Sequence, residues 1–226
     1  MMRENNQPVR KVSKSQTSLR GKSVSIKNNR THDFESSLER DFLNILEFDM
    51  YVLKYCEQPV TIEYLNDGNL RSYTPDFIVY YRDDIEVTKN FKPMLCEIKP
   101  RESLKEHWAI FKPKFKAAIK YAKEQGWTFK IITEKEIRTS YLDNVKFLSY
   151  FQKEHSKIDT DDLSFLMMKL KELRITSPEE LLAAACRDEN RKAELLYTLW
   201  YMIANYFIRC DLNNKLTMKS DIWLAN

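Results

Sequence analysis

Apolar residues recur at helical spacing between residues 33 and 49. They share one face of a predicted helix and are Leu38, Phe42, Ile45 and Leu46. Ser36 and Glu39 have the spacing of a capping box, in which each side chain accepts a hydrogen bond from the backbone N–H of the other residue. The pattern predicts the first helix of the fold and offers a structural role for Glu39.

Strand patterns follow this helix. Residues 51–65 and 70–81 are rich in β-branched and aromatic residues, and the turn sequence NDGN at residues 66–69 separates them. This arrangement predicts antiparallel strands joined by a hairpin turn. The elements predicted downstream are a strand at 94–99, a helix at 102–125 that Pro113 breaks or restarts, a strand at 126–133 and a helix near 140–152. The order predicts an α/β or α+β domain with a mixed sheet flanked by helices.

The pattern changes beyond about residue 155, where helical spacing dominates. Ser177, Pro178 and Glu180 match the N-cap, the first helical residue and the closing partner of a capping box. The neighbouring elements are a helix at 159–173, a helix at 191–207 and two short β runs around the turn at 213–214. Three helices followed by a terminal hairpin are the order of a winged helix, which we expect here as a small, mainly helical domain.

Charge divides the 226 residues further. The chain has a net charge of +4, yet residues 1–33 hold eight Lys or Arg against two acidic residues, so they carry +6 and the remainder carries −2. We expect a basic, flexible N-terminal arm at 1–33, a catalytic domain at 34–153 and a winged-helix-like domain at 154–226. The arm is either a DNA-binding segment that orders on phosphate or a solvated tail.

Composition excludes several classes of protein. No apolar run approaches the roughly 20 residues that span a bilayer, and the N-terminus lacks the apolar core of a signal peptide. The four scattered cysteines have neither zinc-site spacing nor the density of a disulfide scaffold. Three glycines leave no phosphate loop or dinucleotide fingerprint. We therefore expect a soluble cytoplasmic protein with reduced cysteines and no membrane partner.

Carboxylates stand at the ends of two predicted strands. Asp76 follows Pro75, which has no backbone donor and belongs at the first position of a strand or on an edge. In the strand at 94–99, Glu97 and Lys99 share one face because side chains alternate with period two. If the two strands are neighbours, two carboxylates and one ammonium group meet at one edge of the sheet.

Such a cluster suits hydrolysis of a phosphodiester. Adjacent carboxylates repel each other unless they are protonated or bridged by a cation, and oxygen ligands with room for water suit Mg²⁺. Bound Mg²⁺ activates water and stabilises charge on phosphate, and a lysine adds positive charge. Taken singly, Asp76, Glu97 and Lys99 also have ordinary explanations as a turn residue, an exposed strand residue and a surface lysine.

The sequence resembles the TnsA family, the endonuclease subunit of the heteromeric transposase in Tn-seven-like transposons. The resemblance runs from about residue 34 to residue 138 and is carried by SLERDFLNILEFD, EQPVTIEY, YTPDFIVYY, CEIKP and FKIITEKEI. It implies an α/β, restriction-endonuclease-like fold with a mixed sheet, and a metal-dependent DNA endonuclease.

The resemblance also implies roles for particular residues. Glu39, Asp76 and Glu97 correspond to ligands of Mg²⁺, with Mn²⁺ as a possible substitute and two ions expected per site. Lys99 corresponds to the lysine that positions the attacking water or the phosphate. The helical spacing alone leaves both Glu35 and Glu39 open, because both fall near the apolar face.

A second set of residues is more ambiguous. Gln58 resembles a family glutamine near the site, but a polar residue at a strand end is an equal alternative. Basic residues expected to touch DNA are Arg10, Lys11, Lys14, Arg20 and Lys22 in the arm and Lys112, Lys116 and Lys120 on a helix. A solvated helix face is the alternative for the last three. The third C-terminal helix is largely apolar, so we expect its domain to bind protein at least as much as DNA.

The function implied by the resemblance is cleavage of the 5′ ends of a transposon, on the non-transferred strand, during cut-and-paste transposition. The implied partners are double-stranded DNA of the transposon ends, a DDE transposase subunit that acts on the 3′ ends, and an AAA+ ATPase regulator. The implied location is the prokaryotic cytoplasm, with nucleoid association when active. The alternatives are a nuclease of the same fold in restriction or repair, and a non-enzymatic adaptor of the transposase.

Overall fold

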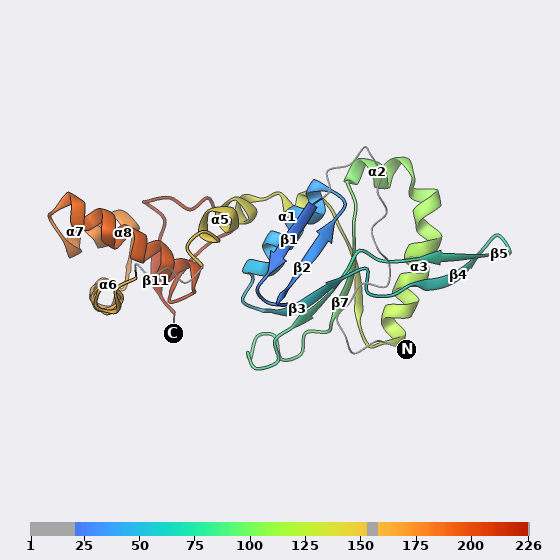
Figure 1. The fold of residues 1–226 in the computed structure, drawn as a ribbon, viewed down its shortest axis with the longest axis horizontal. Coiled ribbons are helices and arrows are strands. Elements are labelled where there is room, and N and C mark those ends of the chain that lie inside the picture. The colour runs from blue at the N-terminus through green and yellow to red at the C-terminus, as the bar shows by residue number, and fades with distance from the viewer. Residues whose placement is uncertain (1–20, 153–157, 226) are drawn as a thin grey trace. The chain divides into compact units, whose positions relative to one another are not determined.

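The computed structural model describes residues 21–152 and 158–225 (Figure 1). The chain divides after Ile137 into two compact units. This boundary lies well before the one expected at residue 153, because α5 (Ser140–Leu148) belongs to the second unit. In the described part of the chain, no helix has the length and the apolar character needed to cross a membrane.

A four-stranded sheet forms the centre of the first unit. Its strands are β3 (Val52–Glu57), β6 (Phe77–Tyr81), β7 (Met94–Ile98) and β8 (Thr128–Ile132), in the order β3-β6-β7-β8. β6 is antiparallel to both β3 and β7, and β8 runs parallel to β7. All five residues of β7 are buried, as expected for a central strand covered on both faces. The predicted mixed sheet is confirmed.

Helices cover both faces of this sheet. α1 (Ser37–Phe48) lies against one face, where the ring of Phe42 is 5.7 Å from that of Phe77. α3 (Trp108–Glu124) lies against the other face. The core on the α3 side includes Cys56, Ile78, Leu95, Phe115 and Ala118. Phe77 packs on the α1 side and Ile78 on the α3 side, because successive strand residues point to opposite faces of the sheet.

The helix predicted at 102–125 is in fact two helices. α2 (Arg101–Glu106) is followed by its C-cap residue His107, and α3 begins at Trp108. Pro113 lies inside α3 and does not interrupt it, so the predicted break was misplaced. Proline removes one backbone donor, but the packing of Phe115 against the sheet holds the helix through this position. The short helix α4 (Glu134–Ile137) follows β8.

Two hairpins accompany the sheet. β4 (Ile62–Asn66) and β5 (Asn69–Tyr73) pair around a turn in which Asp67 and Gly68 have φ values of 50° and 74°. Two successive left-handed residues match a type I′ turn, as the NDGN sequence predicted. The hairpin extends beside α3 in Figure 1.

The second hairpin corrects the predicted flexible arm. β1 (Gly21–Ser25) and β2 (Arg30–Phe34) form an antiparallel pair rather than an unstructured segment. Buried polar contacts fix it: His32 and Arg30 bind the carboxylate of Glu57 on β3. Lys22 is exposed on β1. The other predicted DNA contacts of the arm, namely Arg10, Lys11, Lys14 and Arg20, lie outside the described residues.

The second unit combines helices with a small sheet. Besides α5, it contains α6 (Thr160–Leu173), β9 (Ile175–Thr176), α7 (Pro178–Ala185), α8 (Glu189–Ala204), β10 (Ile208–Cys210) and β11 (Ile222–Leu224). The strands form an antiparallel sheet in the order β10-β11-β9. Ser177 and Glu180 make the predicted capping box, with Pro178 at the start of α7. The winged-helix assignment stays a prediction.

The connection between β10 and β11 is longer than the tight turn predicted around residues 213–214. It spans residues 211–221 and is held by Asn144 of α5. The Asn144 amide donates to the carbonyl oxygens of Leu212 and Asn214 and accepts from the N–H of Leu216. These bonds tie α5 to the second unit.

Candidate active site

Three polar residues lie side by side at one end of the central sheet. When the antiparallel registers of β3 with β6 and of β6 with β7 are continued by one residue, Gln58 and Glu97 flank Asp76. The backbone N–H of Gln58 donates to the carbonyl oxygen of Asp76 at 2.8 Å. The condition that the two carboxylate-bearing strands are neighbours is therefore met.

Asp76 is the central member of this row. Its Oδ2 accepts the backbone N–H of Ile98 at 2.7 Å and lies 3.7 Å from Nζ of Lys99, and its side chain is 19% exposed. Burial raises the pKa of Asp76 to about 8; the charge of Glu97 adds to this rise and Lys99 opposes it. Asp76 is thus an anion that its surroundings stabilise poorly, which favours a further cation at this point.

Glu97 is almost fully enclosed, with 1% of the residue exposed. Its Oε2 accepts the hydroxyl of Tyr73 at 2.7 Å. Its Oε1 lies 3.2 Å from Nζ of Lys99 and 3.0 Å from Nζ of Lys114 on α3. A buried carboxylate is tolerated when it is paired and hydrogen-bonded, and both oxygens of Glu97 meet that condition.

Lys99 lies between the two carboxylates, just after the end of β7. Its backbone N–H donates to the carbonyl oxygen of Ile132 on β8 at 3.1 Å, which fixes the start of the side chain. Burial lowers the pKa of Lys99, but the negative charges of Asp76 and Glu97 outweigh burial and raise it overall. Lys99 therefore stays an ammonium ion, suited to stabilising a phosphate rather than to accepting a proton.

Glu39 lies at the start of α1, where its carboxylate makes local hydrogen bonds. Its carboxylate accepts the hydroxyl of Ser36 and the backbone N–H of Glu35, each at 2.9 Å, while Ser36 Oγ accepts the N–H of Glu39. Burial raises the pKa of Glu39, and Lys99 acts in the opposite direction. Ser36 is thus the N-cap of α1, and only half of the predicted capping box forms, because the Glu39 carboxylate accepts the N–H of Glu35 and not that of Ser36. Glu39 also lies within the electrostatic reach of Lys99. Its role as a metal ligand stays a prediction.

Gln58 has an unusual backbone beside this site. Its φ of 44° is in the left-handed region, which costs a residue with a side chain about 1–3 kcal/mol. Within the described structure, its buried Oε1 accepts no hydrogen bond. Strain and an unsatisfied polar atom next to Asp76 are typical of functional sites, so the accessory role of Gln58 stays a prediction that the geometry favours.

Two residues of the cluster were missed by sequence reasoning. Tyr73 closes β5, three residues before Asp76, and Lys114 reaches Glu97 from the middle of α3. Lys114 has helical spacing next to Phe111 and Phe115, but lysines commonly flank an apolar helix face, so this spacing is no distinctive signal. Nothing in the sequence indicates that this face meets Glu97.

The carboxylates of Asp76 and Glu97 fit a Mg²⁺ ion that takes its other ligands from water and substrate phosphate. Across residues 21–152 and 158–225, no group of three His, Cys, Asp or Glu side chains is arranged to hold a metal ion by itself. Mg²⁺ is usually bound by one or two carboxylates together with water and substrate phosphates. Asp76 and Glu97 provide two neighbouring carboxylates, and the raised pKa of Asp76 indicates negative charge that a cation would offset.

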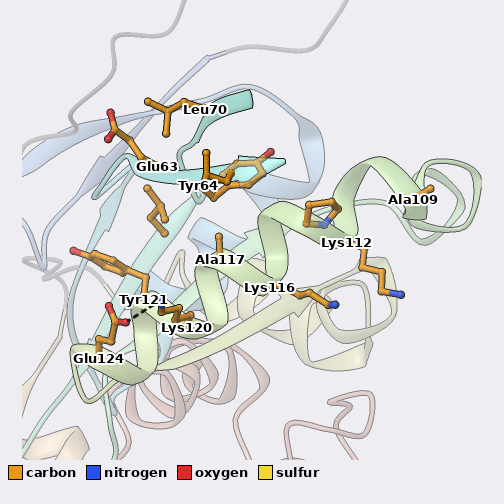
Figure 2. Close-up of a pocket in the computed structure, with 13 residues that line it drawn as sticks. Glu63, Tyr64, Leu70, Ala109, Lys112, Lys116, Ala117, Lys120, Tyr121 and Glu124 are labelled. Carbon is orange, nitrogen blue, oxygen red and sulfur yellow. Dashed lines mark ion pairs between the residues drawn. The ribbon is translucent and has the colours of Figure 1, made fainter. Parts of the chain in front are cut away.

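The predicted row of basic residues lies on α3, beside a groove. Lys112, Lys116 and Lys120 line a hollow of about 690 Å³ between α3 and the β4–β5 hairpin (Figure 2). The apolar part of its lining includes Ile62, Leu65, Leu70, Pro113 and Ala117. Asp76, Glu97 and Lys99 are not part of this lining, so the structure keeps the lysine row apart from the carboxylate cluster.

Comparison with protein families agrees with this geometry. A model described as TnsA-like endonuclease N terminal matches residues 49–134, which include Asp76, Glu97 and Lys99, whereas Glu39 precedes the match. A model described as TnsA endonuclease C terminal matches residues 136–212. A search of curated proteins gave no match. With both endonuclease models matched in order and one residue apart, the chain belongs to the TnsA family, the endonuclease subunits of Tn-seven-like transposases.

Proposed function

We propose that the protein is a Mg²⁺-dependent DNA endonuclease that cuts the 5′ ends of a transposon, on the non-transferred strand, during cut-and-paste transposition. The observation that carries the proposal is the meeting of Asp76, Glu97 and Lys99 at one end of the sheet in a chain of the TnsA family. Two carboxylates with a permanent ammonium ion suit phosphodiester hydrolysis.

The side chains divide the chemistry among them. Asp76 and Glu97 would hold Mg²⁺, with Glu39 as a further ligand, and Mn²⁺ would substitute for it; we keep the expectation of two ions. When bound, Mg²⁺ supplies an activated water and offsets charge on the phosphate. Lys99 is positioned to contact a phosphate oxygen as a water oxygen bonds to phosphorus and the bond to one sugar oxygen breaks. Its raised pKa makes it an electrostatic group rather than a base.

We further propose that the protein works in an assembly. The partners are the DNA of the transposon ends, a DDE transposase subunit that acts on the 3′ ends and an AAA+ ATPase, and the reaction takes place on DNA in the prokaryotic cytoplasm. Membership of the TnsA family supports this proposal. We expect cleavage to require the partners, since an endonuclease of a transposon has to spare other host DNA.

Strand-resolved cleavage of end-labelled transposon-end DNA tests the proposal. The assay compares Mg²⁺ with EDTA, and the protein alone with the protein plus transposase and ATPase. We expect Mg²⁺-dependent cuts at the 5′ ends only when the partners are present. Cuts by the protein alone would favour a restriction or repair nuclease, and no cuts in any combination would favour a non-enzymatic adaptor.

The lysine row on α3 is proposed to contact the DNA backbone. Lys112, Lys116 and Lys120 are exposed and four residues apart, so they succeed one another about every 6 Å along the helix. Figure 2 shows Lys112 and Lys116 reaching away from the hairpin residues Tyr64 and Leu70. Within residues 21–152 and 158–225, the row has one ion pair, between Lys120 and Glu124, with a separation of 3.9 Å.

Changing these three lysines to glutamine should weaken DNA binding mainly at low salt. Each lost phosphate contact lowers the slope of log K against log salt by about 0.9, so we expect a slope smaller by roughly 2 to 3. Fluorescence anisotropy over a salt series measures it. The control changes the exposed Lys89 and Lys92, which precede β7 at the end of the sheet away from Asp76. An equal change of slope per lysine in both variants would contradict a specific contact.

A further inference from the structure

Two ammonium groups share one oxygen of Glu97. Lys99 and Lys114 lie 3.2 Å and 3.0 Å from Glu97 Oε1, and the hydroxyl of Tyr73 binds Oε2. Lys99 also faces Asp76 at 3.7 Å. Of the two ammonium groups, Lys114 has the shorter contact with Glu97, whereas Lys99 is divided between two carboxylates.

Aromatic rings hold Lys114 in this position. Its Nζ is 4.6 Å from the ring centroid of Tyr73, 4.7 Å from that of Phe111 and 5.2 Å from that of Phe115. Cations are attracted to the faces of such rings at these distances. The side chain is only 18% exposed, in contrast with the exposed Lys112 and Lys116 on the same helix. Lys114 is therefore directed at the carboxylate cluster and not at solvent.

The contact between Lys114 and Glu97 affects how freely Lys99 can move. With Lys114 present, the charge of Glu97 is balanced from α3, and Lys99 can move toward a phosphate without leaving Glu97 unpaired. Without Lys114, Lys99 would be the remaining cation on a carboxylate that is 1% exposed. Leaving a buried charge unpaired is strongly unfavourable, so Lys99 would be held at Glu97.

We propose that Lys114 is a positioning residue that balances the charge of Glu97 from α3 and thereby leaves Lys99 available to the scissile phosphate. The proposal rests on the proposed endonuclease function, but it assigns a role to a side chain that lies outside the two strands bearing the carboxylates. It acts through Glu97 and does not require Lys114 to touch DNA.

Cleavage kinetics of Lys114→Met test the proposal in the assembly with transposase and ATPase. We expect the single-turnover rate at saturating DNA and Mg²⁺ to fall about tenfold or more, as for other residues that support a site indirectly. Lys114→Arg should stay within a few fold of wild type. Lys123→Met, at an exposed lysine in the last turn of the same helix, should leave the rate unchanged. An unchanged rate in Lys114→Met, or a loss that more Mg²⁺ removes, would overturn the proposal.

Binding of Mn²⁺ to the full chain, followed by electron paramagnetic resonance, gives a readout without cleavage. Lys114→Met should bind Mn²⁺ at least as tightly as wild type, because a positive charge near Glu97 is lost. In a Glu97→Gln background the same change should have no effect, since an amide needs no counter-charge. Weaker Mn²⁺ binding, or an equal change in both backgrounds, would contradict the proposal.

The role of Lys114 can still be tested if the wild-type protein is inactive or if Lys114→Met does not fold. If wild type cuts no DNA, the endonuclease function fails, and the Mn²⁺ comparison still decides whether Lys114 acts on Glu97. If Lys114→Met fails to fold, Lys114→Gln replaces it, because glutamine can still donate a hydrogen bond to Glu97 but carries no charge. Retention of the full cleavage rate by Lys114→Gln would overturn the role of charge.

Discussion

Asp76→Ala is expected to lower the rate of 5′-end cleavage by a factor on the order of 10³ to 10⁴, the size of effect seen when a carboxylate of a catalytic group is removed. Asp76 lies between Gln58 and Glu97 in the row across the sheet and faces Lys99. Its removal takes away one of two neighbouring carboxylates and leaves Lys99 paired with Glu97 alone.

The fold should survive this substitution. The pKa of Asp76 is raised to about 8, mainly by burial, so its ionised form is unfavourable in the metal-free protein. Residues of this kind are kept for activity at a cost in stability. We therefore expect thermal unfolding of Asp76→Ala in EDTA to occur at or above the wild-type temperature, and the binding of DNA and partners to persist.

The measurement pairs strand-resolved cleavage with thermal unfolding and DNA binding. Asp84→Ala is the control, because Asp84 is an exposed carboxylate that pairs only at the surface with Arg82. Cleavage by Asp76→Ala within about tenfold of wild type would remove Asp76 from the catalytic group. A joint loss of cleavage, DNA binding and folding would instead show a structural role.

Much of the site could be predicted because local rules fix it. Pro75 restricts Asp76 to the start of a strand, and the period of two places Glu97 and Leu95 on one face of β7. The antiparallel register of β6 with β7 then brings Asp76 and Glu97 together. Only the pairing of the two strands had to be assumed, and strands that follow one another in the sequence are usually neighbours in a sheet.

Other parts depended on contacts between distant segments. Lys114 meets Glu97 because α3 packs on the β7 face, which no spacing within α3 encodes. Glu39 could not be separated from Glu35 by helical angle, since both fall near the apolar face. The misplaced break at Pro113 has the same origin: tertiary packing outweighs the local preference of proline.

The β1–β2 hairpin shows most clearly why charge patterns can mislead. Its sequence is polar and basic, which is typical of a disordered arm. The structure buries His32 completely and gives it and Arg30 a common partner, Glu57 on β3. The backbone N–H of Ile26 and the hydroxyl of Ser25 also bind the carboxylate of Glu47 on α1. Hydrogen bonds and ion pairs between residues that are more than 20 positions apart hold this hairpin in place, although it has no apolar stripe.

Glu57→Ala is therefore expected to destabilise the first unit by about 3–5 kcal/mol, the cost of removing one partner from a buried ion pair. The side chain of Glu57 is 8% exposed and those of His32 and Arg30 are 0% and 21% exposed, so little water can replace the lost carboxylate. Urea unfolding measures the free energy, and hydrogen exchange at residues 21–34 should show that the hairpin loses protection first.

The surface pair of Arg82 and Asp84 provides the matched control. Asp84 is exposed, and removing one member of such a surface pair has little effect on stability. If Glu57→Ala and Asp84→Ala had equal effects, the buried cluster would not hold the hairpin. The opposite result is a large loss of unfolding free energy in Glu57→Ala, with faster hydrogen exchange in the hairpin and an intact cleavage site. It would establish that residues 21–34 are part of the folded domain because Glu57 binds His32 and Arg30 on β2.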